Sequence, residues 1–109
     1  MQTNTDGEGS PFACNMKAMN IQQRQRYDVL TKRLQMTGHE IKELPDGYAF
    51  RLPPEPSVIK DAAEWITYER LCCPFLDFGL EVERAGGAMW LRLRGREGVK
   101  PFIRSEFGF

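Results

Sequence analysis

The sequence predicts an α+β fold in which a four-stranded, mainly antiparallel sheet has helices packed on one face, with the element order α-ββα-ββα (a two-layer sandwich). Two observations lead to this fold class. Apolar residues recur at helical spacing in two long stretches, 20–36 and 58–72, and alternate with polar residues in short ones. Turn sequences containing Asp46-Gly47 and Gly86-Gly87 join short stretches in pairs, so two hairpins with one apolar face each are expected.

The composition is that of one small globular domain. The 109 residues carry 15 basic and 15 acidic side chains, and this balance argues against a broad surface for nucleic acid or anionic membranes. No apolar run approaches the roughly 20 residues that a spanning helix needs. Residues 1–10 are polar, so we expect a flexible N-terminal tail rather than a signal peptide, and a single α+β domain over residues 11–109. We therefore expect a cytoplasmic protein.

The first predicted helix begins after Asn20 and runs to about Met36. Asn20 is a favourable N-cap residue, and Gln23 completes an amide form of the capping box. Gly38 is expected to end the helix, because glycine readily adopts the left-handed conformation found there. One apolar stripe marks the side that packs inward: Tyr27, Leu30 and Leu34.

The next predicted elements are a hairpin and a second helix. The hairpin consists of His39–Leu44 and Tyr48–Leu52, joined by the turn Pro45-Asp46-Gly47. Prolines after residue 52 break the sheet. Ser57 is then expected to cap a helix that runs from Val58 to about Cys72.

The second half of the chain repeats the order strand, strand, helix. Pro74 disfavours helical geometry at the residue before it, and strict alternation over Leu76–Glu83 predicts a third strand. The turn Ala85-Gly86-Gly87 leads into a fourth strand, Ala88–Arg94. A last short helix carries Pro101 in its first turn, where a missing N–H costs little.

Reactive side chains are concentrated at Cys72-Cys73-Pro74, where the second long helix must stop. At about 100° per residue, Glu69 lies near the middle of the apolar side of that helix, one turn before Cys73. A carboxylate there is costly unless it is paired, protonated or bound to a cation. Two explanations stay open. One is a buried ion pair with an arginine of the sheet, such as Arg92, and the other is a role as ligand or proton acceptor for the thiols.

The three cysteines cannot form a fully paired set of disulfides. In a reducing cytoplasm we expect all of them to be free thiols or ligands. Cysteines can simply fill small apolar gaps, but adjacent side chains point in different directions and do not easily share one gap. Soft thiolates favour ions of the Zn²⁺, Cu⁺, Hg²⁺ and arsenite class, with Cys72 and Cys73 as the primary ligands. The candidates for a third ligand are Cys14, Met16, Met19 and Glu69.

Catalysis by a cysteine is not favoured by these positions. A thiolate at a helix C-terminus is opposed by the helix dipole, and the single histidine, His39, is more typical of a surface strand than of a catalytic base. Gly95, Gly98 and Lys100 precede the last helix and resemble an anion-binding turn. We favour an ordinary strand-to-helix turn over a phosphate site as the explanation of the same residues.

The run Glu69-Arg70-Leu71-Cys72-Cys73-Pro74-Phe75-Leu76-Asp77-Phe78 resembles an E-R-x-C-C-P-F-L-x-F signature of short bacterial proteins that have no established activity. Later parts of the chain, Gly86-Gly87, Leu91-Arg92-Leu93 and residues 95–102, also match that family's pattern, as do an early cysteine and the turn before Tyr48. Arg94-Gly95-Arg96 departs from the T-G-P that is common there, which argues against a shared ligand at this loop. The family's association with heavy-metal-responsive neighbours implies a soft-metal function.

Three hypotheses follow from the sequence. The first is a small thiol protein that binds a soft metal ion through the vicinal dithiol. The second is a non-catalytic interaction domain, expected to form homo-oligomers, in which Phe102, Phe107 and Phe109 offer an exposed apolar patch. The third is a thiol–disulfide redox protein that uses a Cys72–Cys73 disulfide, whose small ring would be strained and readily reduced.

Overall fold

A computed structural model describes residues 12–37 and 40–109. The predicted tail, residues 1–10, lies outside the described residues, as do Pro11, His39 and Gly38, which was predicted to end the first helix. The division of the chain into a tail and one domain therefore stays a prediction. No helix in the described parts of the chain combines the length and apolar character needed to cross a membrane.

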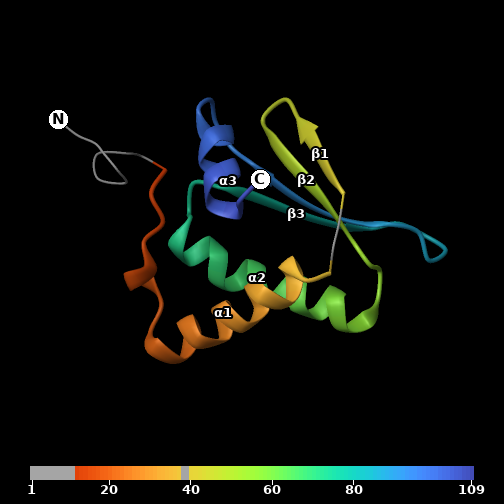
Figure 1. The fold of residues 1–109 in the computed structure, drawn as a ribbon, viewed down its shortest axis with the longest axis horizontal. Coiled ribbons are helices and arrows are strands. Elements are labelled where there is room, and N and C mark those ends of the chain that lie inside the picture. The colour runs from red at the N-terminus through yellow and green to blue at the C-terminus, as the bar shows by residue number, and fades with distance from the viewer. Residues whose placement is uncertain (1–11, 38–39) are drawn as a thin grey trace.

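The predicted α+β architecture and its element order are confirmed. The four strands are β1 (Ile41–Leu44), β2 (Gly47–Leu52), β3 (Asp77–Val82) and β4 (Met89–Arg94). They form one sheet in the order β1-β2-β4-β3 in which every neighbouring pair is antiparallel. The helices are the short 3-10 turn η1 (Met16–Ala18), α1 (Ile21–Gln35), α2 (Pro56–Cys72) and α3 (Val99–Phe107). Figure 1 shows α1 and α2 side by side, with the strands above them and α3 next to the strands.

One face of the sheet is apolar, and its side chains form one side of the hydrophobic core. The alternation predicted from the sequence places Phe50 opposite Leu91, and Leu91 opposite Leu80, in the middle of this face. The opposite face carries charged side chains, with Arg51 and Glu81 flanking Trp90 across the strands. Since only one face is apolar, the helices pack on that face alone.

The start of α1 confirms the predicted capping box. The backbone N–H of Gln23 donates to Asn20 Oδ1 at 2.8 Å, and the backbone N–H of Asn20 donates to Gln23 Oε1 at 2.9 Å. Two otherwise unpaired donors are thereby satisfied where α1 begins.

The predicted cap of α2 is wrong, because the helix starts one residue before Ser57. Its N-cap residue is Glu55, whose side chain makes no capping hydrogen bond, and Pro56 is at the first helical position. Proline is suited to that position because its φ is fixed near the helical value and it has no N–H to satisfy. Proline also forces the residue before it into an extended conformation, as seen for Glu55 at φ −95° and ψ 147°.

The expected exposed patch of C-terminal aromatic residues is also not observed. Phe107 and Phe109 pack on the core, with ring centroids 6.1 and 5.5 Å from that of Phe50. Phe102 packs edge-on against Phe75 at 5.0 Å. These rings continue the apolar face of α3 onto the sheet, so the aromatic residues that motivated the interaction hypothesis are largely used inside the fold.

Contacts between α1 and α2 fix the rotation of α2 about its axis. Arg26 forms a bidentate ion pair with Glu64, with N–O distances of 2.9 and 2.8 Å. One residue further along α2, the Trp65 Nε1–H donates to Thr31 Oγ1 at 3.0 Å. With Trp65 directed into the core, the residue one helical turn later, Glu69, must also face inward.

Candidate metal and thiol site

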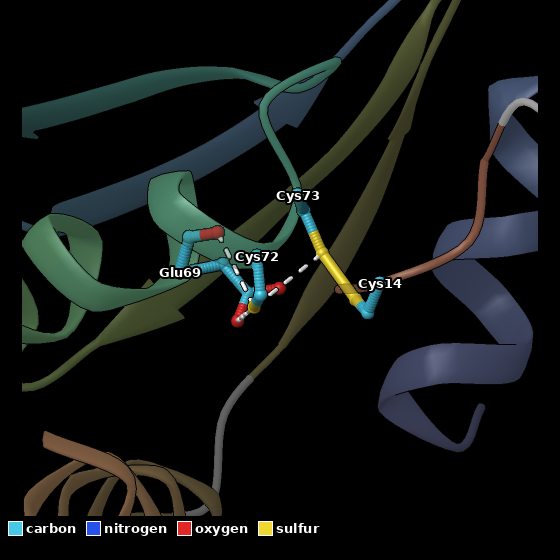
Figure 2. A group of neighbouring side chains, drawn as sticks. All are labelled: Cys14, Glu69, Cys72 and Cys73. Atoms are coloured by element: carbon cyan, nitrogen blue, oxygen red, sulfur yellow. Dashed lines mark hydrogen bonds between the residues drawn. A yellow bond between two sulfur atoms is a disulfide. The ribbon is translucent and has the colours of Figure 1, made fainter. Parts of the chain in front are cut away.

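A cluster of three sulfurs and one carboxylate lies at the C-terminal end of α2 and is called the cysteine cluster here. It consists of Cys14, Glu69, Cys72 and Cys73, whose potential ligand atoms all lie within 4.8 Å of one another. Figure 2 shows Glu69 and Cys72 on the last turn of α2, with Cys14 approaching from the segment before α1. These four residues, which the sequence offered as candidate ligands, thus lie together, and their use as a metal site stays a prediction.

The end of α2 is determined by residues 72–74. Cys73 is the C-cap residue, and its backbone N–H donates to the Glu69 carbonyl oxygen at 2.8 Å. Pro74 follows and cannot continue the helix. The backbone is therefore helical at Cys72 and non-helical at Cys73, so the two side chains point in different directions. Both residues are fully buried.

Cys14 and Cys73 form a disulfide, so the expectation that all three cysteines are free thiols or ligands is wrong for these two residues. Their Cα atoms are 5.0 Å apart, within the usual range for a disulfide, although 59 positions separate them in the sequence. Cys72 is the free, buried cysteine.

The predicted redox pair, a disulfide between Cys72 and Cys73, is also wrong. Their sulfur atoms are 3.9 Å apart, which is a non-bonded contact. The physical reason lies in the chain geometry: adjacent residues can form a disulfide only through a strained small ring, whereas Cys14 reaches Cys73 from a separate segment.

Glu69 lacks the predicted arginine partner. The guanidinium of Arg92 is 2.9 Å from Glu81 instead, because Arg92 alternates with Leu91 and Leu93 and so points to the charged face of the sheet. Of the described ion pairs, none includes Glu69. The interpretation of Glu69 as a buried ion pair with an arginine is therefore not supported.

The carboxyl group of Glu69 is fully buried and only partly satisfied. Its Oε1 accepts a weak hydrogen bond from the Cys72 thiol at 3.8 Å. Its Oε2 has no hydrogen-bond partner among the residues that the structure describes. Burial raises the pKa of Glu69 to about 7, an effect that Tyr27 and Cys72, which lie against the carboxyl group, offset in part and that Glu106 increases.

The Cys72 thiol is held in its protonated form. Burial and the neighbouring charge of Glu69 raise its pKa to about 12. This agrees with the sequence-based expectation that a thiolate at this helix end is disfavoured. A metal ion that binds Cys72 must therefore displace the thiol proton, and Glu69 Oε1 is the acceptor within reach.

Two residues near the cluster were not predicted. Tyr27 of α1 faces Glu69, and its own pKa is raised by burial and by that carboxylate. Glu106 of α3 is largely exposed, but its Oε2 is 3.6 Å from Cys14 Sγ, and partial burial of its carboxyl group raises its pKa. Glu106 follows buried Ile103 by three positions on the helix, a spacing that places both on one side.

The two methionines suggested as third ligands differ in burial. Met19 belongs to the buried core, and Met16 is 37% exposed. Of the four candidates for a third ligand, the structure groups Cys14 and Glu69 with the vicinal cysteines.

Gly95 and Gly98 lie in the turn between β4 and α3, and Lys100 lies in the first turn of α3. Gly98 is the N-cap residue and has φ 94°, a conformation that favours glycine. Lys100 Nζ is 2.5 Å from Glu43 Oε2 and 2.8 Å from the Leu44 carbonyl oxygen. The lysine therefore joins α3 to β1, and an anion site at this turn stays a prediction.

No family model matches this chain, and no curated protein or solved structure shows significant similarity to it. The site is therefore interpreted from its own geometry.

Proposed function

We propose that this chain is a cytoplasmic protein that binds one soft metal ion at the cysteine cluster when its thiols are reduced. Cys72 and Cys73 act as primary ligands, Cys14 as the third sulfur ligand, and Glu69 as an oxygen ligand or proton acceptor. The observation that carries this proposal is the fully buried carboxyl group of Glu69: its Oε2 has no hydrogen-bond partner among the described residues, and one of its oxygens lies within 4.8 Å of three cysteine sulfurs.

Packing alone explains the cysteines but not the carboxylate. Cys72 and Cys73 are as buried as small apolar residues would be. An unsatisfied buried carboxyl oxygen costs several kcal/mol if it is charged and about 1–3 kcal/mol if it is neutral. Glutamine or leucine at position 69 would avoid the charge. A cation bound between the carboxylate and the sulfurs would instead be stabilised by the negative charge of Glu69.

The donor atoms favour a soft or borderline ion. Three sulfurs and one oxygen supply the four ligands of a tetrahedral site, as Zn²⁺ prefers, and thiolates also select Cu⁺, Hg²⁺ and arsenite. The family that the Glu69–Phe78 run resembles carries the same implication of a soft metal. Because Cys72 is protonated in the metal-free protein, binding releases protons and strengthens as the pH rises.

The test is native mass spectrometry of reduced, metal-stripped protein titrated with Zn²⁺, Cu⁺, Hg²⁺ and arsenite. We expect one ion per chain and at least a tenfold loss of affinity in Cys72→Ser and in Glu69→Gln. Glu81→Gln is the matched control, because that carboxylate is on the charged face of the sheet. Equal affinity in wild type and in a Cys72→Ser/Cys73→Ser double variant would overturn the proposal.

A further inference from the structure

We infer that the Cys14–Cys73 disulfide is a redox lock on the metal site, and that an external dithiol opens the lock by attacking Cys14. The inference rests on the proposed function, since it concerns the regulation of the same site. It uses the position of the disulfide within the cluster and the different exposure of the two bonded cysteine residues.

Disulfide formation and metal binding compete for the same atoms. A cysteine binds a metal ion as a thiolate, and a sulfur that is bonded to another sulfur has no thiolate to offer. The disulfide removes Cys14 and Cys73 as ligands and leaves Cys72 and Glu69. Two ligands do not complete a closed site. The oxidised protein should therefore bind the ion far more weakly than the reduced protein.

The three cysteines of the cluster differ in their exposure to solvent. Cys72 and Cys73 are fully buried, whereas Cys14 is partly exposed. A thiolate must contact the sulfur that it attacks, so the attack occurs at Cys14 and Cys73 is the leaving group. Figure 2 shows Cys14 on the segment before α1 and Cys73 directly after the end of α2.

A dithiol reductant supplies the electrons and protons that reduce the Cys14–Cys73 disulfide. Its first thiolate forms a bond to Cys14 Sγ, the Cys14–Cys73 bond breaks, and Cys73 leaves as a thiolate that takes up a proton. The second thiol of the reductant then attacks the mixed disulfide, releases Cys14 as a thiol and leaves the reductant as its own disulfide. Two electrons and two hydrogens pass from the reductant to the protein.

Opening the disulfide need not dismantle the cluster. The backbone N–H of Asn15 donates to the Cys72 carbonyl oxygen at 2.8 Å, and the Phe12 ring packs edge-on against Phe75 at 5.3 Å. Both contacts keep the segment around Cys14 on the end of α2 without a covalent bond. After reduction, the Cys14 thiol can donate to Glu106 Oε2, which is already 3.6 Å away.

The first experiment compares Zn²⁺ binding by the reduced and the oxidised protein in competition with a chromophoric chelator. Thiols are counted in parallel by alkylation in denaturant and mass spectrometry. We expect three alkylated cysteines and one bound Zn²⁺ in the reduced form. We expect one alkylated cysteine and at least a hundredfold weaker binding in the oxidised form.

The possible failures are distinguishable. Three alkylated cysteines after mild oxidation, with Zn²⁺ binding intact, would overturn the lock and leave the proposed function standing. Equal Zn²⁺ affinity in both redox forms would do the same. Absence of Zn²⁺, Cu⁺, Hg²⁺ and arsenite binding in the reduced form would overturn the proposed function and the lock with it.

The direction of attack is tested separately with glutathione, a monothiol that leaves the mixed disulfide in place. Oxidised wild type and Cys72→Ser are treated with glutathione, quenched in acid and analysed by peptide mapping. We expect glutathione on Cys14 in both proteins. The Cys72→Ser variant lacks the Cys72 thiol, so that thiol cannot displace the glutathione from Cys14. Glutathione on Cys73 would show that the buried sulfur is attacked and would overturn this part of the inference.

Discussion

The backbone N–H of Asn15 donates a hydrogen bond to the carbonyl oxygen of Cys72, with an N–O distance of 2.8 Å. This bond uses one of the carbonyl groups that the end of α2 leaves without an intrahelical partner. It also holds Asn15, which follows Cys14, against Cys72, which precedes Cys73. The disulfide therefore connects two segments that the backbone already holds together.

Stability should depend on pH through Glu69. In the metal-free protein, the folded-state pKa of about 7 lies above the ordinary value of 4.5, so the folded state binds more protons than the unfolded state between these pH values. The contribution of Glu69 to the free energy of unfolding should be greatest below about pH 4.5 and fall as the pH rises to about 7, by up to about 3 kcal/mol. Urea unfolding at several pH values measures this.

Glu69→Gln should remove that dependence and raise the free energy of unfolding above pH 7 relative to wild type. Glu81→Gln, on the charged face of the sheet, should keep it. An identical pH slope in wild type and Glu69→Gln would show that the buried carboxyl group is not its source.

Reduction of the disulfide should lower stability in the absence of metal. The bond closes a loop over a separation of 59 positions, and breaking it restores conformational freedom to the unfolded chain at a cost of about 2–4 kcal/mol. Guanidinium unfolding with and without a reductant measures the difference. Cys14→Ser is the control, because a reductant should leave its unfolding midpoint unchanged.

Cys72 should react slowly with alkylating reagents in the folded protein. Its pKa of about 12 leaves a thiolate fraction at pH 8 that is about 10³-fold smaller than that of an ordinary exposed cysteine. The rate of iodoacetamide modification of the oxidised protein reports this residue alone. Full reactivity should return in denaturant, and equal rates in the folded and unfolded states would contradict the burial of the thiol.

Gly47→Ala should be strongly destabilising. A Cβ atom at this position would overlap the carbonyl oxygen of Leu93 in the neighbouring strand, which is backbone and cannot move aside. We expect a loss of more than about 2 kcal/mol. In Gly79→Ala the added methyl would lie 3.6 Å from Arg92 Cβ, an ordinary contact, so this control should stay within about 0.5 kcal/mol of wild type.

The two predicted helix caps can be separated by matched substitutions. Asn20→Ala removes a hydrogen bond to the Gln23 N–H and should cost about 1 kcal/mol. Ser57→Ala should leave the melting temperature nearly unchanged, because Ser57 lies inside the first turn of α2 and does not cap it. Equal losses in both variants would contradict the observed start of α2.

Local sequence patterns predicted the elements well. Alternation over the strands and the capping residue Asn20 depend on neighbours within a few positions, and they gave the order of elements and the face that is buried. The assignment of Ser57 as the N-cap of α2 was wrong, and the reason is again local. Pro56 occupies the first helical position, which proline favours, so the helix begins before Ser57.

Partners that are distant in the sequence were harder to predict. The position of Glu69 on the apolar side of α2 follows from helical spacing, but its neighbours Tyr27 and Glu106 come from α1 and α3. The pairing of Cys14 with Cys73 depends on how the segment before α1 crosses the end of α2. Neither spacing nor cysteine number contains that information.

The place of β4 in the sheet has a consequence for biosynthesis. β4 lies between β2 and β3, so β3 cannot join the β1–β2 hairpin in one sheet until residues 89–94 have been made. Both bonded cysteines precede those residues in the chain. As the polypeptide leaves the ribosome, the two sulfurs can therefore meet while the sheet is still incomplete, and the cellular redox conditions act on a nascent chain before they act on the finished protein.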